Sequence, residues 1–373
     1  CTDYDRGKAA GSWCYELCVV KSFTLHGGCV EQEDSVVTFR YKGTIVRIPQ
    51  STSKRSFTKR SSYWIPDLNE PISVSEFDSQ LRNLLHSKLG PIDSDEIVER
   101  IYQFADFSHD GEVSFGEANS IWKLLNNHEF FLIFLFKDNL VFPFLNGTCG
   151  GLYAYEYIGR RSLFNSENKT FLNYFFTNPY RWTLPDWEKR ANIAVGLLEY
   201  GTTTSEIYNV KFLMCDLVAT RFGHTEFYEP KLLTYDHIQS EYAVSEILKQ
   251  KKCRYDSDCI FKRHCESTCN VSTGYCSPNL KLPSLMAICK LVREYLAFDA
   301  PEKIRDQLDS LLSQCVRISE RIQLTLEESQ RQYNIVRYNI VIGSIQELLW
   351  DQIENKPPNW LKPKPVKVVK PTS

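Results

Sequence analysis

The sequence lacks a long hydrophobic stretch. Its longest unbroken apolar run, Phe130–Phe136, has seven residues, whereas a helix that spans a bilayer needs about 20. We therefore expect no part of this 373-residue chain to cross a membrane. The chain begins with Cys1 rather than Met, so a signal peptide or signal anchor is a candidate for a segment ahead of it.

An excess of either charge is also missing. Lys and Arg number 44 against 46 Asp and Glu, for a net charge of -2, which excludes a polybasic nucleic-acid binder or a protein dominated by an acidic tail. Hydrophobic residues make up 43% and charged residues 24%, the balance of a folded globular protein. The length predicts two or three domains, and the composition excludes collagen, coiled-coil and wholly disordered chains.

Cysteine pairs with the C-x2-C spacing of zinc sites are absent. The 13 cysteines instead fall mainly in two groups, four within the first 29 residues and five between Cys253 and Cys276. Such clusters indicate disulfide bonds formed in an oxidising compartment. The odd count leaves one thiol that is free or bonded to another chain. Three N-x-[ST] sequons agree with a secretory location, at Asn146, Asn168 and Asn270.

The order of periodic segments predicts an α+β fold. Alternating apolar residues predict two strands within 35–48 around a turn at Lys42 and Gly43. A hairpin is predicted over 141–157 around Asn146 and Gly147, a strong turn signal. Helices are predicted over 73–89, over 94–105, after Glu117, over 186–200 and within 281–355. Short strands are predicted over 212–215 and 231–235.

We expect four regions along the chain. They are a Cys-rich segment over 1–35, strands and helices over 36–158 with a helical insertion at about 75–127, a helical region over 159–355 that holds the Cys cluster 253–276, and a Pro- and Lys-rich disordered tail over 356–373. Within 281–355, a disulfide between Cys289 and Cys315 is expected to join two helices.

The strongest motif is a calcium loop. Asp106–Glu117 follows the twelve-residue pattern D-x-[DN]-x-[DN]-G-x5-E, and Gly111 allows the sharp turn at its sixth position. The expected oxygen ligands are Asp106, Ser108, Asp110, the carbonyl of Glu112, Ser114 through water, and both carboxylate oxygens of Glu117. Ser108 replaces the usual Asp or Asn, so we expect weak affinity, roughly 10⁻⁴–10⁻³ M, which still suffices in a calcium-rich lumen. The alternative is an acidic loop without metal.

Two aspartates each follow a short apolar segment. Asp216 follows Phe212–Cys215, and Asp236 follows Lys231–Tyr235 further on. In a protein kinase the catalytic-loop Asp is the base and the Asp of D-F-G binds Mg²⁺. From this pattern alone, two strand-end residues that cap turns are the better interpretation.

The order of several motifs resembles the divergent protein kinase domain 1 family, which are cysteine-rich type II membrane proteins of the endoplasmic reticulum. The motifs are WCYELC at the N-terminus, the single calcium loop after two helices, TCGGLYAYE, RANIAVGLLE, FLMCD and the spacing C-x5-C-x5-C-x3-C-x6-C. The resemblance covers nearly all of residues 13–350. It implies a two-lobed, disulfide-rich protein-kinase-like fold with one EF-hand inserted in the N-lobe.

The resemblance also implies roles for individual residues. Asp216 matches the catalytic base and Asp236 the metal-binding Asp. Arg47, in Ile45–Arg47, stands where the family has the Lys that binds ATP phosphates, and Glu129 is its expected helix partner. Arg47 and Asp236 are therefore the expected nucleotide-site residues, with Mg²⁺ or Mn²⁺ as the accompanying ion.

Several kinase features are missing. No G-x-G-x-x-G loop precedes the strands, and Gly27 and Gly28 are a poor substitute. Arg47 replaces Lys, which is not a conservative change. Arg221 stands at the Asn position, where a cation would repel a metal ion or replace its charge. His237 and Ile238 replace the F-G of D-F-G. Together these departures favour a pseudokinase, or a kinase with one metal and unusual nucleotide geometry.

Weaker candidates have plainer interpretations. Cys215 near His224 could be a thiol nucleophile, but a disulfide is expected in this compartment. Asp256 and Asp258 could bind an ion, but a polar turn held by disulfides is the better interpretation. The Phe130–Phe136 run is expected to be core.

Three hypotheses follow. The first is a secretory-pathway pseudokinase that binds calcium and acts by binding a luminal or secreted protein. The second is an active divergent kinase that uses Asp216 and Asp236 on luminal or secreted substrates. The third is a calcium-binding, disulfide-rich extracellular interaction protein. The expected location is the endoplasmic reticulum lumen or the cell exterior, with membrane contact only through an anchor outside this chain and no nucleic-acid partner.

Overall fold

The computed structural model describes residues 1–20, 31–33, 36–41, 44–49, 73–156, 158, 163, 184–203, 206–263, 265–280, 284–325 and 327–353. Several predictions lie outside these residues. They are the turn at Lys42 and Gly43, the Gly27–Gly28 pair, the sequon at Asn168 and the tail over 356–373.

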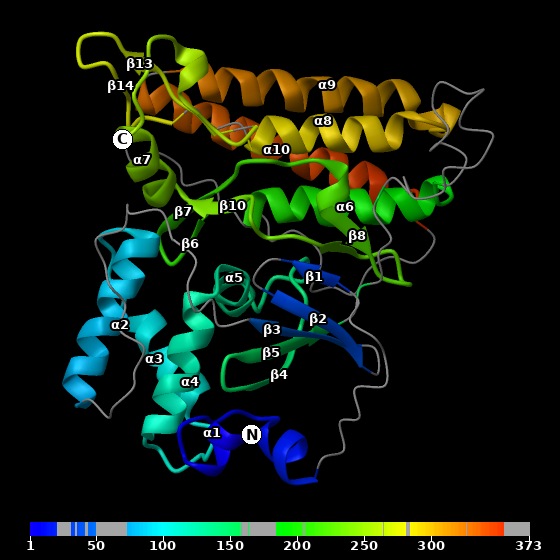
Figure 1. Cartoon of the computed structure of the whole chain (residues 1–373). Coiled ribbons are helices and arrows are strands. Elements are labelled where there is room, and N and C mark those ends of the chain that lie inside the picture. The colour runs from blue at the N-terminus through cyan, green and yellow to red at the C-terminus, as the bar shows by residue number, and fades with distance from the viewer. Residues whose placement is uncertain are drawn as a thin grey trace, which may run out of the picture.

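A five-stranded antiparallel sheet forms one part of the molecule (Figure 1). Its strand order is β1 (Glu31–Glu33), β2 (Val36–Tyr41), β3 (Thr44–Pro49), β5 (Leu152–Glu156) and β4 (Leu145–Cys149). The two strands predicted within 35–48 are confirmed as β2 and β3, which pair antiparallel. β3 also pairs with β5, and this register sets Arg47 opposite Tyr153.

Four helices accompany the sheet: α2 (Val74–Leu89), α3 (Asp95–Ala105), α4 (Phe115–Asn126) and α5 (His128–Leu135). The predicted start of α2 is confirmed, because the Ser73 side chain accepts a hydrogen bond from the backbone N–H of Glu76. Phe130–Phe136 is buried throughout, as predicted. In Figure 1, α5 lies between the sheet and the helical part of the molecule.

The helical part contains α6 (Trp187–Thr203), α7 (Glu241–Lys249), α8 (Ser284–Ala297), α9 (Glu302–Leu324) and α10 (Glu328–Trp350). α6, α8, α9 and α10 lie side by side (Figure 1). Arg190, which is buried, donates hydrogen bonds from α6 to the carbonyls of Tyr295 and Phe298. Within the described residues, every helix falls short of the length and hydropathy that a bilayer-spanning segment requires.

Further short strands pair antiparallel outside the five-stranded sheet. β7 (Val210–Met214) pairs with β6 (Glu206–Ile207) and with β10 (Ile238–Ser240). The other pairs are β8 (Phe222–His224) with β9 (Pro230–Leu232), β11 (Ile260–Phe261) with β12 (Cys265–Glu266), and β13 (Cys269–Asn270) with β14 (Tyr275–Cys276). The strand predicted over 231–235 therefore ends early, at Leu232.

Disulfides account for twelve of the cysteines. The bonds are Cys1–Cys18, Cys14–Cys149, Cys215–Cys265, Cys253–Cys269, Cys259–Cys276 and Cys289–Cys315. The predicted bond between α8 and α9 is thus confirmed. Cys253, Cys259 and Cys269 hold their sulfur atoms within 4.8 Å of one another, but all three are in disulfides and offer no thiolate to a metal. The thirteenth cysteine, Cys29, lies outside the described residues.

The predicted turn of the β4–β5 hairpin is wrong. The chain turns at Gly150 and Gly151, while Asn146 and Gly147 lie inside β4, where the register shifts. A Cβ atom on Gly147 would lie 2.4 Å from the Trp13 ring. Gly147 therefore serves the close approach of the N-terminal segment, a long-range contact that a local turn signal does not reveal.

Candidate functional site

Two antiparallel strands bring Asp216 and Asp236 to the same place. Met214 of β7 pairs with Ile238 of β10, and each aspartate lies two residues beyond this pair. The ladder continues through a hydrogen bond of 2.7 Å from the Cys215 N–H to the His237 carbonyl. The two carboxylates, twenty residues apart in the sequence, therefore leave the ladder at the same end.

Arg221 binds both carboxylates with one guanidinium group. Its Nη2 atom lies 2.7 Å from Asp216 Oδ2, and its Nη1 atom lies 3.0 Å from Asp236 Oδ1. The same Nη1 atom donates to the Thr234 hydroxyl at 3.0 Å. Arg221 immediately precedes β8, and its carbonyl accepts a hydrogen bond from Leu233 N–H. A fixed cation thus lies between the two aspartates.

Two more cations come from the Cys-rich segment. Lys262 Nζ lies 2.7 Å from Asp236 Oδ2 and also donates to the Asp236 carbonyl. Arg263 Nε lies 3.7 Å from Asp216 Oδ1. Burial opposes ionisation of Asp236, but Lys262 and Arg221 hold the pKa of this carboxyl below its ordinary value. The cluster therefore combines two carboxylates with three cations.

A disulfide fixes this arrangement. Lys262 and Arg263 form the turn between β11 and β12. Cys265, at the start of β12, is bonded to Cys215, the residue directly before Asp216. Lys262 and Arg263 were not predicted as site residues from the sequence. The position of Cys215 beside Asp216 was the available signal that part of the Cys cluster is attached at this site.

Arg47 and Glu129 also meet. Arg47 Nε lies 3.2 Å from Glu129 Oε1 and donates to the Tyr155 hydroxyl at 3.0 Å. Burial alone would lower the pKa of Arg47, but Glu129 and Tyr155 raise it above its ordinary value. Burial, reinforced by Glu129, raises the pKa of Tyr155. The pair joins β3 to the first turn of α5.

The loop between α3 and α4 gathers carboxylate oxygens. Glu117, which is buried, accepts hydrogen bonds at Oε1 from Ser108 N–H (2.9 Å) and at Oε2 from Ser114 N–H (2.8 Å). The Asp106 carboxylate accepts from the N–H groups of Asp110 and Gly111. Gly111 has φ +84°, a conformation that favours glycine. The oxygen donors of this loop, which also include Ser108, Asp110 and Ser114, suit a hard cation such as Ca²⁺.

The plainer interpretations of the weaker candidates hold. Cys215 is in a disulfide and cannot act as a thiol nucleophile. Asp258 accepts hydrogen bonds from the N–H groups of Arg254 and Tyr255, and Asp256 accepts one from Cys269 N–H. Both aspartates thus stabilise turns in the disulfide-bonded segment.

The sheet with its Arg47–Glu129 ion pair, and the two aspartates at the end of one strand ladder, define a protein-kinase-like domain. Residues 121–318, just over half of the chain, match the family model described as the protein-kinase domain of FAM69, and the chain belongs to this family. The matched residues include Glu129, Asp216, Arg221 and Asp236. Arg47 and the loop 106–117 lie outside them.

Proposed function

We propose that this protein is a calcium-binding pseudokinase of the secretory pathway that acts by binding another protein. The observation that carries the proposal is the Arg221 guanidinium, which bonds to both Asp216 and Asp236. In an active kinase these positions supply the base and a metal ligand. Here both carboxylates already have a permanent cationic partner, because guanidinium stays protonated at any physiological pH.

Charge repulsion explains why a metal would bind poorly. Two unit charges 4 Å apart interact by about 4 kcal/mol at an effective dielectric constant near 20, and by about 1 kcal/mol in bulk water. A divalent ion near Arg221 and Lys262 would face about twice that repulsion from each cation. Asp236 is about half exposed, so solvent screening places the actual value between these limits. Arg221, Lys262 and Arg263 already offset the negative charge of the two carboxylates, so the cluster offers a divalent ion little net attraction.

Calcium would have a structural role in this proposal. The loop 106–117 would be an EF-hand inserted in the N-lobe of a two-lobed fold, with Asp106, Asp110 and Glu117 among its ligands. Its second helix, α4, contacts the N-terminal segment. Ser120 Oγ accepts a hydrogen bond from Ala10 N–H at 2.8 Å, and Asn119 donates one to the Lys8 carbonyl at 2.7 Å. Calcium would therefore brace the N-terminal segment as well as the loop.

A secretory location is supported by the disulfides and by two exposed sequon asparagines, Asn146 and Asn270. The protein would be a glycoprotein of the endoplasmic reticulum lumen, held there as a type II membrane protein by a signal anchor, or it would be secreted. Its partner would be a luminal or secreted protein.

The second candidate is an active divergent kinase. The Arg47–Glu129 ion pair favours it, because active kinases join their phosphate-binding cation to a helix glutamate. In this case Arg47 would contact ATP phosphates and Asp236 would bind Mg²⁺ or Mn²⁺. Arg221 and Lys262 would first have to leave Asp236.

The deciding experiment is nucleotide binding by calorimetry on the full secreted chain, with ATP and Mg²⁺. The proposal predicts no Mg²⁺-dependent binding by the wild type and a gain of such binding in Arg221→Asn. Arg293→Asn is the matched control, because Arg293 lies in an exposed ion pair with Asp309 and should change nothing. Mg²⁺-dependent binding by the wild type that disappears in Asp236→Ala would contradict the proposal and favour the active kinase, which a phosphorylated product would then have to establish.

A further inference from the structure

The β13–β14 hairpin presents the sequon at Asn270 to solvent. Asn270 ends β13, Val271 and Ser272 follow in the turn, and all three residues are exposed. Val271 keeps 83% of its surface exposed. In Figure 1 the hairpin lies at the end of the molecule away from the five-stranded sheet. A sugar attached to Asn270 would therefore extend into solvent and leave the fold unchanged.

The turn already orients the Asn270 amide. Its Oδ1 atom accepts hydrogen bonds from Ser272 N–H at 3.0 Å and from Thr273 N–H at 3.3 Å. Both bonds use the carbonyl oxygen, which a glycosylated Asn keeps because the sugar is attached at Nδ2. The turn therefore holds the side chain in a conformation that suits the modified and the unmodified residue alike.

An aromatic ring lies beside Asn270 across the hairpin. Asn270 pairs with Tyr275 of β14 in the antiparallel register. Their side chains therefore lie on the same face, with Cβ atoms about 4.5–5.5 Å apart. Tyr275 is 40% exposed, and the negative face of an aromatic ring attracts polarised C–H groups such as those of a sugar ring. The first sugar on Asn270 would thus have an aromatic surface within reach.

The sequon at Asn146 is built differently. Its Gly147 lies against Trp13, and its Thr148 is buried. Modification of Asn146 would therefore have to precede the packing of the N-terminal segment on β4. The exposed sequon at Asn270 stays accessible in the folded chain.

We propose that Asn270 carries an N-linked glycan whose first N-acetylglucosamine packs against the Tyr275 ring. The proposal rests on the secretory location proposed above, and it does not depend on the pseudokinase function. In the modification, Nδ2 of Asn270 forms a bond to C1 of an oligosaccharide carried on a lipid diphosphate. The C1–O bond breaks, the lipid diphosphate leaves with the electron pair, and Nδ2 releases one proton.

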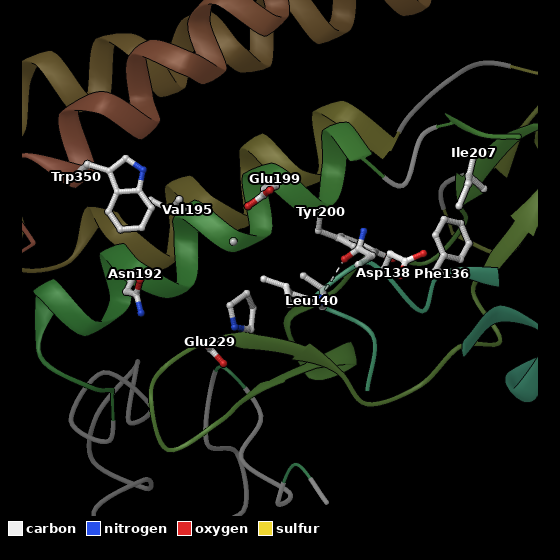
Figure 2. A pocket seen from close by; sticks show the side chains of 14 residues that line it. Phe136, Asp138, Leu140, Asn192, Val195, Glu199, Tyr200, Ile207, Glu229 and Trp350 are labelled. Atoms are coloured by element: carbon white, nitrogen blue, oxygen red, sulfur yellow. Dashed lines mark hydrogen bonds between the residues drawn. The ribbon is translucent and has the colours of Figure 1, made fainter. Parts of the chain in front are cut away.

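The glycan would cover exposed apolar surface on a short hairpin. Val271 and Tyr275 are both exposed there, and an isolated two-stranded hairpin is only marginally stable. The aspartate cluster and the cavity of about 460 Å³ beside α6 (Figure 2) are formed, among the described residues, by side chains outside 265–280. The sugar is therefore attached outside both.

The test uses the full chain expressed through a secretory pathway, with Asn146→Gln and Asn168→Gln, so that Asn270 is the one remaining sequon. Peptide-N-glycosidase F should lower the mass of this chain by one N-glycan. Ser272→Ala should remove the glycan and Ser272→Thr should keep it, because the sequon requires a hydroxyl at this position. Ser272 bonds to Asn270 through its backbone N–H, so neither change deletes that donor.

Amide hydrogen exchange in the hairpin tests the contact with Tyr275. Relative to the chain with Ser272→Ala, the glycan should slow exchange by about twofold to fivefold, the range that one cross-strand contact supplies. Tyr275→Phe keeps a ring and should keep this ratio, whereas Tyr275→Ser should bring it close to one. Each variant is compared with and without Ser272→Ala, so that its own effect on the hairpin cancels.

Two results would overturn the proposal. One is a chain with Asn270 as its one sequon that carries no glycan. The other is a glycan that slows exchange equally with Tyr275 and with Tyr275→Ser. Failure of the proposed location is a separate result. It would be seen as native protein outside the secretory pathway, whereas the test chain is directed into that pathway.

Discussion

Among single residues, His237 stands out as a buried imidazole beside Asp236 whose two ring nitrogens have no hydrogen-bond partner among the described residues. Burial, with help from Arg221, lowers its pKa from 6.5 to about 4. Between these pH values the unfolded chain binds more protons than the folded chain. The native state therefore loses stability as the pH falls from 6.5 towards 4, by up to about 3 kcal/mol from this residue.

His237→Phe should remove this loss. Relative to wild type, we expect the free energy of unfolding to rise by about 2 kcal/mol more at pH 5 than at pH 7.5. Urea unfolding at the two pH values measures the difference. His86→Gln, at an exposed histidine, is the control and should leave the pH dependence as it is. Equal acid sensitivity of His237→Phe and wild type would contradict the assignment.

The Arg47–Glu129 pair is the second feature at this scale. Both side chains are largely buried, with 15% and 18% of their surfaces exposed, so removing one partner leaves a charge in a poorly solvated place. Arg47→Met should cost about 2–4 kcal/mol of stability. The double variant with Glu129→Leu should recover part of that cost. A double-mutant cycle by urea unfolding measures the coupling, and additive effects would show that the pair is not coupled.

At the scale of elements, we predict that the helix–loop–helix from α3 to α4 binds calcium and that calcium stabilises the native state. At ten times the dissociation constant, Ca²⁺ should stabilise the native state by about 1.4 kcal/mol, measured as a rise in melting temperature. Glu117→Gln should abolish this rise. Glu112→Gln should keep it, because position 7 contributes its backbone carbonyl. A calcium shift that survives Glu117→Gln would place the ion elsewhere.

The β11–β12 hairpin is held over the aspartates by the Cys215–Cys265 disulfide. Replacing both cysteines by Ala removes a disulfide between residues 50 positions apart in the sequence. In the chain-entropy account, this loss lowers the free energy of unfolding by about 4 kcal/mol. We also expect faster amide exchange around Lys262. The double Ala variant of Cys289 and Cys315 should lose similar stability without faster exchange at Lys262. Faster exchange there in both variants would show that this disulfide has no special role at the site.

Local patterns predicted most individual elements. The helices predicted over 73–89 and from 94 to 105 depend on neighbouring residues, and the structure confirms them as α2 and α3. The β4–β5 turn was misplaced because Gly147 is needed by Trp13, more than a hundred residues away in the sequence. A propensity for turns carries no information about such a contact.

For the whole molecule, the positions of Asp216, Arg221 and Asp236 could be predicted from motif order, but their joint geometry could not. That geometry depends on the β7–β10 register, which places both aspartates within reach of one guanidinium. Lys262 and Arg263 could not be assigned to the site, because six disulfides allow many pairings and only the Cys215–Cys265 bond brings them there.

The most direct test of the account is a thermal-shift titration of the full chain, expressed through a secretory pathway, with ATP and Mg²⁺ or Mn²⁺, with and without Ca²⁺. A ligand that binds only the folded state raises the melting temperature by mass action. The account predicts a shift with calcium and none with nucleotide. A calcium-dependent nucleotide shift that disappears in Asp236→Ala would contradict it and establish a working nucleotide site.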